Sequence, residues 1–406
     1  MSILNTKSTV VGCSLGKIVR LFATFDLSSD YNSLQKTCKD FANNELRPIA
    51  SETDRLKRFP GEQIKKLADL GFMGINVSKK YGGSELDTLA TSIVVEEISN
   101  GCASTGIILA IHNCLYADLV NRHGTEKQKE EFLRPFTTGD IGAFALSEYN
   151  AGSDVVNIST TARRDGDFFV LNGSKAWVTS AYQAKAAIIF ATVDRQLGHK
   201  GISAFLIPLN NQLEVSLGPA DDKMGIKGTS TSSIILQDCR VHKDNLIGNI
   251  GEGFQIAMAQ LQLARIGVAS QALGIGQVTL DLAVSYASTR HLFGKQMIDL
   301  QLVKSKIAKM AVDLESARLL TWKAARLRDA NSDYRKLSSM AKYAASRCAT
   351  SNAHQCVQIL GGMGYVSNMA AERHYRDARI TQIYGGVTDV QTLIIAERVA
   401  EEYDTK

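Results

Sequence analysis

The sequence predicts a mainly α-helical protein with a central β-domain, arranged as an N-terminal helical domain, a middle β-barrel and a C-terminal four-helix bundle. Apolar residues recur with a helical period in the first and last thirds, and with an extended period between them. The 406 residues exceed the usual size of one domain, and a composition with 45% hydrophobic residues and five prolines is typical of an ordered chain. We place the domain boundaries at residues 30–140, 141–253 and 254–406.

Residues 1–29 differ in composition from the rest of the chain. The first 25 residues contain neither Asp nor Glu, are rich in Ser, Thr and small apolar residues, and carry Lys7, Lys17 and Arg20. A secretory signal carries its charge before one continuous apolar core, whereas two of these basic residues lie late in the segment. We interpret the segment as a mitochondrial transit peptide and predict a location in the mitochondrial matrix.

The N-terminal domain is predicted to contain at least three helices. One covers residues 31–44 and precedes Pro48, a second covers residues 60–70 and ends at Gly71, and a third covers residues 86–100 and ends at Gly101. Proline and glycine are the usual residues at which helices stop.

The middle third is predicted to form an antiparallel β-domain, which we expect to be a small barrel. Asn172-Gly173 is a strong signal for a β-hairpin turn. No strand alternates with a long helix, and no G-x-G-x-x-G or Walker sequence is present, so a dinucleotide-binding βαβ fold is excluded. The extended runs lie at residues 168–171, 177–179, 187–192, 203–208 and 233–236.

The last third is predicted to form a helical bundle. Its rods cover residues 254–289, 300–330 and 334–360, and a last helix lies near residues 389–402. Apolar residues spaced three and four apart indicate the buried stripe of a long helix. That stripe consists of Leu300, Val303, Ile307, Met310, Leu314 and Ala317.

Charge and cysteine usage exclude several classes of protein. The 46 basic and 41 acidic side chains are interleaved, which argues against nucleic-acid binding through charge alone. No apolar run approaches the roughly 18 residues of a membrane span. The seven cysteines show neither C-x-x-C spacing nor grouping with histidine, so we expect buried thiols and no metal site.

Three glycine-containing stretches lie where the predicted domains meet. Residues 144–154 form a polar loop, which is either an ordinary turn or part of a binding site. Residues 175–180 place an aromatic ring beside a hydroxyl, which suits either a core strand or a flat heterocyclic ligand. Residues 358–365 end a helix, and their glycines are either a C-cap or a point of close approach to a ligand.

Together these stretches resemble the acyl-CoA dehydrogenase family over about residues 31–402. Three further segments make the sequence most similar to the short-chain members: IGVASQALG at residues 266–274, LESARLLTW at 314–322 and AERHYRDAR at 371–379. The resemblance implies noncovalent FAD between the β-domain and the C-terminal bundle of a homotetramer. It also implies a short acyl-CoA substrate and electron-transferring flavoprotein as partner.

The resemblance assigns roles to individual residues. Arg290 belongs to a T-R-x-x-F-G element and would neutralise the FAD pyrophosphate, a task that suits the guanidinium. Part of the cofactor contact would come from a neighbouring subunit. The residues implied to bind FAD are Phe144, Leu146, Ser147, Ser153, Trp177, Val178, Thr179, Arg290, Phe293, Gln301, Gln358, Leu360, Gly361, Gly362, Val387, Thr388 and Asp389. Those implied to contact substrate are Ser153, Gln262, Arg265 and Gly386.

The catalytic base that the resemblance implies is missing. Short-chain members carry a glutamate in a loop reading I-Y-E-G-T-S-E, and this chain has Gly385 at that place. Other members carry the glutamate on the long helix, where this chain has Ala264. Asp389 and Glu148 are the carboxylates to consider instead, and neither matches a base position. Losing a positioned base typically costs on the order of 10²–10⁴ in rate.

The sequence leaves two functions open. The first is flavin-dependent oxidation of a short acyl-CoA to the 2-enoyl thioester. The second is binding of FAD and acyl-CoA by a paralogue with little or no turnover. A flavin-free helical scaffold is a weaker alternative, because Arg290 and Trp177 are retained.

Overall fold

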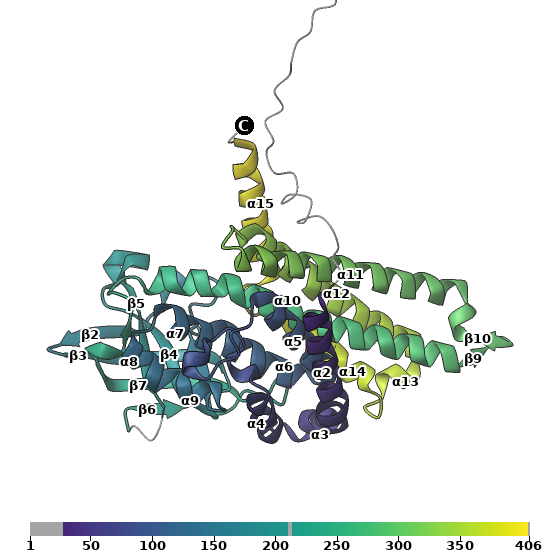
Figure 1. The fold of residues 1–406 in the computed structure, drawn as a ribbon, viewed down its shortest axis with the longest axis horizontal. Coiled ribbons are helices and arrows are strands. Elements are labelled where there is room, and N and C mark those ends of the chain that lie inside the picture. The colour runs from purple at the N-terminus through teal and green to yellow at the C-terminus, as the bar shows by residue number, and fades with distance from the viewer. Residues whose placement is uncertain (1–26, 210–212, 405–406) are drawn as a thin grey trace, which may run out of the picture.

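The computed structural model describes residues 27–209 and 213–404. Almost all of the predicted transit peptide therefore lies outside the described residues. The sheet occupies one end of the molecule beside the N-terminal helices, while long C-terminal helices run to the opposite end (Figure 1). The last helix projects from the side of this body (Figure 1). The order of helices, strands and helices is the predicted one.

The N-terminal region is helical throughout. We predicted that the first helix ends before Pro48, but the helical path continues through a π-helical turn to Leu56. Pro48 is tolerated because it lies in the first turn of α3, where its missing N–H is not needed. The elements are α2 (Ser29–Phe41), η1 (Ala42–Leu46), α3 (Arg47–Leu56), α4 (Gly61–Asp69), η2 (Phe72–Gly74), η3 (Lys79–Tyr81), α5 (Thr88–Gly101), α6 (Ala103–Ile111), η4 (His112–Ala117), α7 (Asp118–His123), α8 (Glu126–Phe132) and α9 (Arg134–Thr137).

The β-domain is one eight-stranded sheet in the order β6-β7-β3-β2-β4-β5-β8, with β1 beside β4. Within the described residues the terminal strands β6 and β8 do not pair, so the ladder is open. Most pairs are antiparallel as predicted, but β1 and β2 run parallel to β4. The strands are β1 (Ile141–Ala145), β2 (Thr161–Asp165), β3 (Phe168–Thr179), β4 (Ala184–Thr192), β5 (Ile202–Pro208), β6 (Val215–Leu217), β7 (Thr231–His242) and β8 (Leu246–Ile247). The short helices of this region are η5 (Val155–Asn157), η6 (Arg195–Gly201) and η7 (Lys243–Asn245).

The predicted turn at Asn172-Gly173 is wrong, because β3 passes straight through it. The hairpin between β2 and β3 turns instead at Gly166, which has a φ of 61°. Gly173 lies at a register shift against β7, and a Cβ there would lie 2.7 Å from the Cα atom of Thr160. Close backbone packing inside a bulged strand therefore explains this glycine.

The C-terminal helices lie close to their predicted bounds. Four residues of the predicted stripe are buried, and Leu300 and Ile307 pack against the core. The main rods α10, α11 and α12 pack on one another, and α10 also packs on α5. The elements are α10 (Gly253–Thr289), β9 (His291–Leu292), β10 (Lys295–Gln296), η8 (Met297–Asp299), α11 (Gln301–Asp329), α12 (Arg335–Leu360), α13 (Gly362–Tyr365), α14 (Ala370–Arg379), η9 (Ile380–Gln382) and α15 (Thr388–Asp404).

One stretch, Ala103–His123, is long and apolar enough to cross a membrane, but 94% of its most apolar window is buried inside the protein. It belongs to the core that joins the N-terminal helices to the bundle. The expected burial of cysteines is confirmed for Cys38, Cys102, Cys114, Cys239, Cys348 and Cys356, while Cys13 lies outside the described residues.

Candidate active site

The predicted loop after β1 and the end of β3 lie together. The backbone N–H of Ala176 donates to the Ser147 carbonyl at 2.8 Å, and the rings of Tyr149 and Trp177 meet edge to face with centroids 5.4 Å apart. Of the predicted residues in this loop, Leu146 is buried, Phe144 and Ser147 are half-buried and Ser153 is exposed. The structure therefore brings two of the three stretches together.

Trp177 turns its indole toward solvent. Its φ of 55° is rare for a bulky residue, and the pairing with β7 is irregular between Lys175 and Val178. The indole is consequently 50% exposed, while Val178 beside it is buried and Thr179 is half-buried. A half-exposed indole next to a hydroxyl is a surface on which a flat heterocycle can stack and form hydrogen bonds.

A buried ion pair holds this loop from behind. Lys175 is fully buried and donates from Nζ to Glu148 at 2.7 Å and to the Leu146 carbonyl at 3.1 Å. The Glu148 carboxylate also accepts from the backbone N–H groups and hydroxyls of Ser159 and Thr160. Burial raises the pKa of Glu148, but attraction by Lys175 and these hydrogen bonds lower it to about 2. Glu148 is thus a structural anion.

The segment of residues 384–388, here called the Gly385 loop, lies between α10 and α12. The Tyr384 hydroxyl donates to Gln271 of α10, and the Gly386 carbonyl accepts from Lys342 of α12 at 2.6 Å. Within the described residues, the backbone N–H of Gly385 donates to no acceptor. A Cβ at Gly385 would meet only Val268, at 3.3 Å. The loop therefore presents a free amide beside the empty side-chain position of Gly385.

Helix α10 supplies the wall next to this space. Ala264, Arg265 and Val268 are spaced so that they share one face of the helix, the face that meets Gly385. Arg265 is buried with 9% exposure, and its Nη1 donates to Ser339 of α12 at 3.2 Å. Of the predicted substrate residues, Gln262 is half-buried, and Arg265 and Gly386 lie at the same wall.

The end of the Gly385 loop opens into a groove of about 690 Å³. Three predicted cofactor residues, Val387, Thr388 and Asp389, contribute to its lining. Asp389 is exposed there, at the start of α15, and Arg347 and Arg379 line the same groove. The other lining residues are Thr350, Ser351, His354, Tyr375, Gln382 and Ile383.

The remaining predicted residues lie at the opposite end of the molecule. Arg290 follows α10 and comes 25 residues after Arg265, or about 37 Å along a helix of 1.5 Å rise. Figure 1 shows the β9–β10 hairpin at the end away from the sheet. Phe293 is 90% exposed in this hairpin, and Gln301 is also exposed. Within one chain, these residues therefore lie far from Trp177.

The C-terminus of α12 packs at this same far end. Leu360 is buried in a cluster with Ala283 and Ala287 of α10, while Gln358, Gly361 and Gly362 are exposed. Gly361 caps α12 with a φ of 61°, so the simple interpretation as a helix C-cap holds. Its backbone nevertheless remains open to a partner.

Sequence reasoning missed Lys342. This side chain is fully buried and reaches the Gly385 loop, although lysine is normally a surface residue. Its neighbours Ala341 and Ala345 are buried too, so a lysine within the apolar stripe of α12 was the available signal.

Three family models match in succession: the acyl-CoA dehydrogenase N-terminal domain over residues 28–140, the middle domain over 143–239 and the C-terminal domain over 251–400. The chain belongs to the acyl-CoA dehydrogenase family. It is therefore an FAD-dependent oxidoreductase by family.

Individual relatives match over nearly their whole length. The mitochondrial short-chain specific acyl-CoA dehydrogenase of Homo sapiens is 50% identical over 384 residues, which are 94% of this chain and 93% of that protein. The structure of butyryl-CoA dehydrogenase from Megasphaera elsdenii superposes with a TM-score of 0.91 and 37% identity, covering 93% of this chain and all of that one. An FAD complex of PigA has a TM-score of 0.89 and 28% identity, with 93% and 99% coverage.

The residues present fit the cofactor FAD. The half-exposed indole of Trp177 and the neighbouring Thr179 offer a stacking face and a hydroxyl. The exposed Arg290 offers a guanidinium for a pyrophosphate, but from the far end of the chain. The fit is therefore complete only if a second chain brings its hairpin to the Trp177 site.

Proposed function

We propose that this protein binds a short acyl-CoA beside FAD and oxidises it slowly to the 2-enoyl thioester, passing electrons to electron-transferring flavoprotein in the mitochondrial matrix. The support is the free amide of Gly385, which is positioned at a wall formed by α10 and α12. An amide N–H that meets no protein acceptor is suited to bind a thioester carbonyl and to stabilise negative charge on its oxygen. The chemistry that FAD supplies when bound is acceptance of the hydride from the β-carbon.

Slow turnover follows from the lack of a base. Gly385 and Ala264 carry no proton acceptor, and Glu148 is held by Lys175 and four further donors. Asp389 is exposed in the arginine-lined groove at the start of α15. The second candidate, a binding protein without turnover, is favoured by these same observations. Both candidates share the binding of FAD and acyl-CoA.

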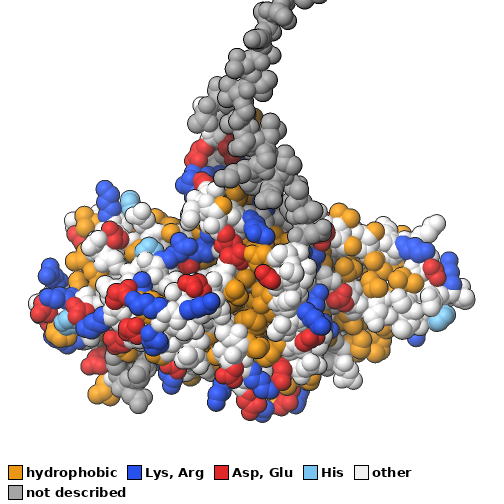
Figure 2. Space-filling model, viewed as in Figure 1, with side chains coloured by type: hydrophobic (Ala, Val, Ile, Leu, Met, Phe, Trp, Pro, Cys, Tyr) orange, Lys and Arg blue, Asp and Glu red, His pale blue; other side chains and the backbone are white. Residues whose placement is uncertain are grey.

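A homotetramer is part of the proposal, because Arg290, Phe293 and Gln301 lie far from Trp177 in one chain. They can contact the same FAD only if they come from a second chain. Large apolar side chains are exposed on this half of the molecule, among them Phe293 at 90%, Leu302 at 78% and Tyr365 at 84%. Figure 2 shows hydrophobic side chains gathered on the surface at the end where Figure 1 has α11 and the hairpin. Exposed apolar patches of this kind mark protein interfaces.

The experiment that tests the function is Gly385→Glu, assayed with butyryl-CoA and longer acyl-CoAs under anaerobic conditions. We expect flavin bleaching to accelerate at least about tenfold, which requires ~1.4 kcal/mol of barrier. Val268 must move slightly, because the new Cβ would lie 3.3 Å from it, and the φ of 66° is strained for a glutamate. No acceleration, with butyryl-CoA still bound, would favour the binding protein.

The matched control is Gly385→Gln. Glutamine imposes the same strain and nearly the same volume but supplies no base, so its rate should remain at the parent level. An equal gain in both variants would show that side-chain volume, not proton removal, was limiting. Parent protein that binds neither FAD nor butyryl-CoA would contradict both proposed functions.

A further inference from the structure

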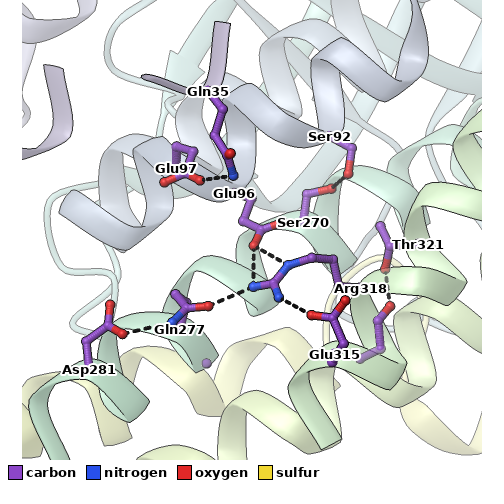
Figure 3. A network of polar contacts seen from close by, with 12 residues as sticks. Gln35, Ser92, Glu96, Glu97, Ser270, Gln277, Asp281, Glu315, Arg318 and Thr321 are labelled. Atoms are coloured by element: carbon purple, nitrogen blue, oxygen red, sulfur yellow. Dashed lines mark hydrogen bonds and ion pairs between the residues drawn. The ribbon is translucent and has the colours of Figure 1, made fainter. Parts of the chain in front are cut away.

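Four lysine and arginine side chains are buried among the residues that the structure describes: Lys175, Arg265, Arg328 and Lys342. Lys175 pairs with Glu148 at 2.7 Å, and Arg328 pairs with Asp118 at 2.6 Å. The nearly buried Arg318 of α11 likewise meets Glu96 of α5 and Glu315, as Figure 3 shows. Arg265 and Lys342 differ, because no described carboxylate pairs with either of them.

Arg265 and Lys342 are also neighbours. Ser339, which accepts from Arg265, lies one helical turn before Lys342 on α12. Burial and the charge of Arg265 lower the pKa of Lys342 to about 7, so the two cations repel each other. The Nε of Arg265 is buried and has no hydrogen-bond partner within the described residues. Two cations thus share one buried wall without a counter-charge.

Asp118, which acts electrostatically on the neighbouring phenol of Tyr334, is engaged by other residues. Asp118 is engaged by Arg328 at 2.6 Å, by Gln260 at 3.0 Å and by Arg122 at 3.0 Å. The titratable group that interacts electrostatically with Arg265 is the phenol of Tyr334. Burial raises the pKa of that phenol. A buried cation without a partner destabilises the folded state unless a ligand compensates its charge.

We propose that Arg265 and Lys342 form an anion subsite that binds a carboxylate group beside Gly385. Gly385 leaves its side-chain position empty, and a Cβ there would meet Val268 alone, at 3.3 Å. A carboxylate matches the donors, because its two oxygens can accept from the Nε edge of a guanidinium and from an ammonium group. The Gly386 carbonyl, which now accepts from Lys342, also accepts from Gln391 at 3.0 Å and would keep that bond.

The carboxylate has two possible sources. It is either a free monocarboxylate of the size of formate, or the terminal carboxylate of an acyl chain delivered as a thioester. The second source rests on the proposed function, whereas the first does not. Formate binding and acyl-CoA binding therefore need separate measurements.

The first experiment measures thermal unfolding and formate affinity of the FAD-containing protein in sodium formate, with ionic strength held constant by sodium chloride. We expect a saturable rise of the midpoint, and at least a tenfold weaker formate affinity in Lys342→Met. Arg265→Gln, which loses the charge but retains a polar amide, serves if the first variant does not fold. Lys323→Met removes an exposed lysine and should respond to formate like the parent.

The outcomes are distinct. No formate response in the parent, or an equal response in the parent and Lys342→Met, would overturn the subsite. A response to sodium phosphate but not to formate would also overturn it, because the ligand would not be a carboxylate.

The second experiment identifies the source by competition. If formate weakens the binding of succinyl-CoA but not of butyryl-CoA, the acyl carboxylate occupies the subsite. If formate binds and competes with neither thioester, the free carboxylate is the ligand. If formate binds while no thioester binds at all, the subsite stands and the proposed function fails.

Discussion

Two lysines are fully buried among the residues that the structure describes, and their surroundings are opposite. Lys175, in the β-domain, lies 2.7 Å from Glu148, and burial lowers its pKa to about 8 despite that attraction. Lys342, in the C-terminal bundle, has a carbonyl as its acceptor and a guanidinium as its charged neighbour. The comparison teaches that a buried lysine with a structural role has a carboxylate partner, whereas the buried lysine at the wall of the candidate active site has none within the described residues.

The largest expected effect is that of Lys175→Met. The change leaves the Glu148 carboxylate buried without its cation, and breaking a buried pair in this way costs about 3–5 kcal/mol. Urea unfolding at neutral pH would measure the loss. Lys243→Met, which breaks the exposed pair with Asp167, should leave the stability almost unchanged, because solvent screens that pair. Equal losses in the two variants would remove the basis of the comparison.

The opposite sign is expected for Lys342→Met in buffer free of carboxylic acids. Here the substitution removes an unpaired charge, so the free energy of unfolding should stay level or rise by about 1–2 kcal/mol. A loss as large as that of Lys175→Met would mean that Lys342 is compensated by a group inside the chain.

The pH dependence sharpens this second prediction. The pKa of Lys342 falls from 10.5 to about 7 on folding, so between these values the unfolded chain holds the proton and the folded chain does not. Stability of the parent therefore rises with pH across this window. The advantage of Lys342→Met should be greatest below pH 7 and should vanish near pH 10.5. Urea unfolding of both proteins below pH 7 and near pH 10.5 measures this difference. An advantage that stays constant with pH would contradict the lowered pKa of Lys342.

The smallest effect concerns Val387 at the end of the Gly385 loop. Val387→Thr supplies a hydroxyl in the groove where the family resemblance implies a contact with FAD. One hydrogen bond is worth about 1 kcal/mol, so the variant should bind FAD about fivefold more tightly than the parent does. Val387→Ala shortens the side chain without adding a donor and should show no such gain. Flavin fluorescence during dilution provides the measurement.

Much of the fold was predictable because it depends on local periodicity. The rods α10, α11 and α12 begin and end within a few residues of their predicted bounds. The failures are places where tertiary contacts override a local signal. Asn172-Gly173 reads as a turn, yet β7 and Thr160 hold Gly173 inside a strand.

The candidate site was predictable in part. Trp177 and the loop after β1 were expected to meet, and they do. The distance between this site and Arg290 was not predictable, because it depends on where α10 lies relative to the sheet. Lys342 was missed because lysine burial depends on what packs around it.

The sequence by itself determined the order of helices and strands, the family, and the lack of a carboxylate at Gly385 and Ala264, since each of these depends on residue identity and spacing. Only the tertiary structure decided which cations lose their water and which carboxylates reach them. The reason is physical: burial and ion pairing arise between residues far apart in the chain, such as Arg265 and Lys342, and no local pattern encodes their distance.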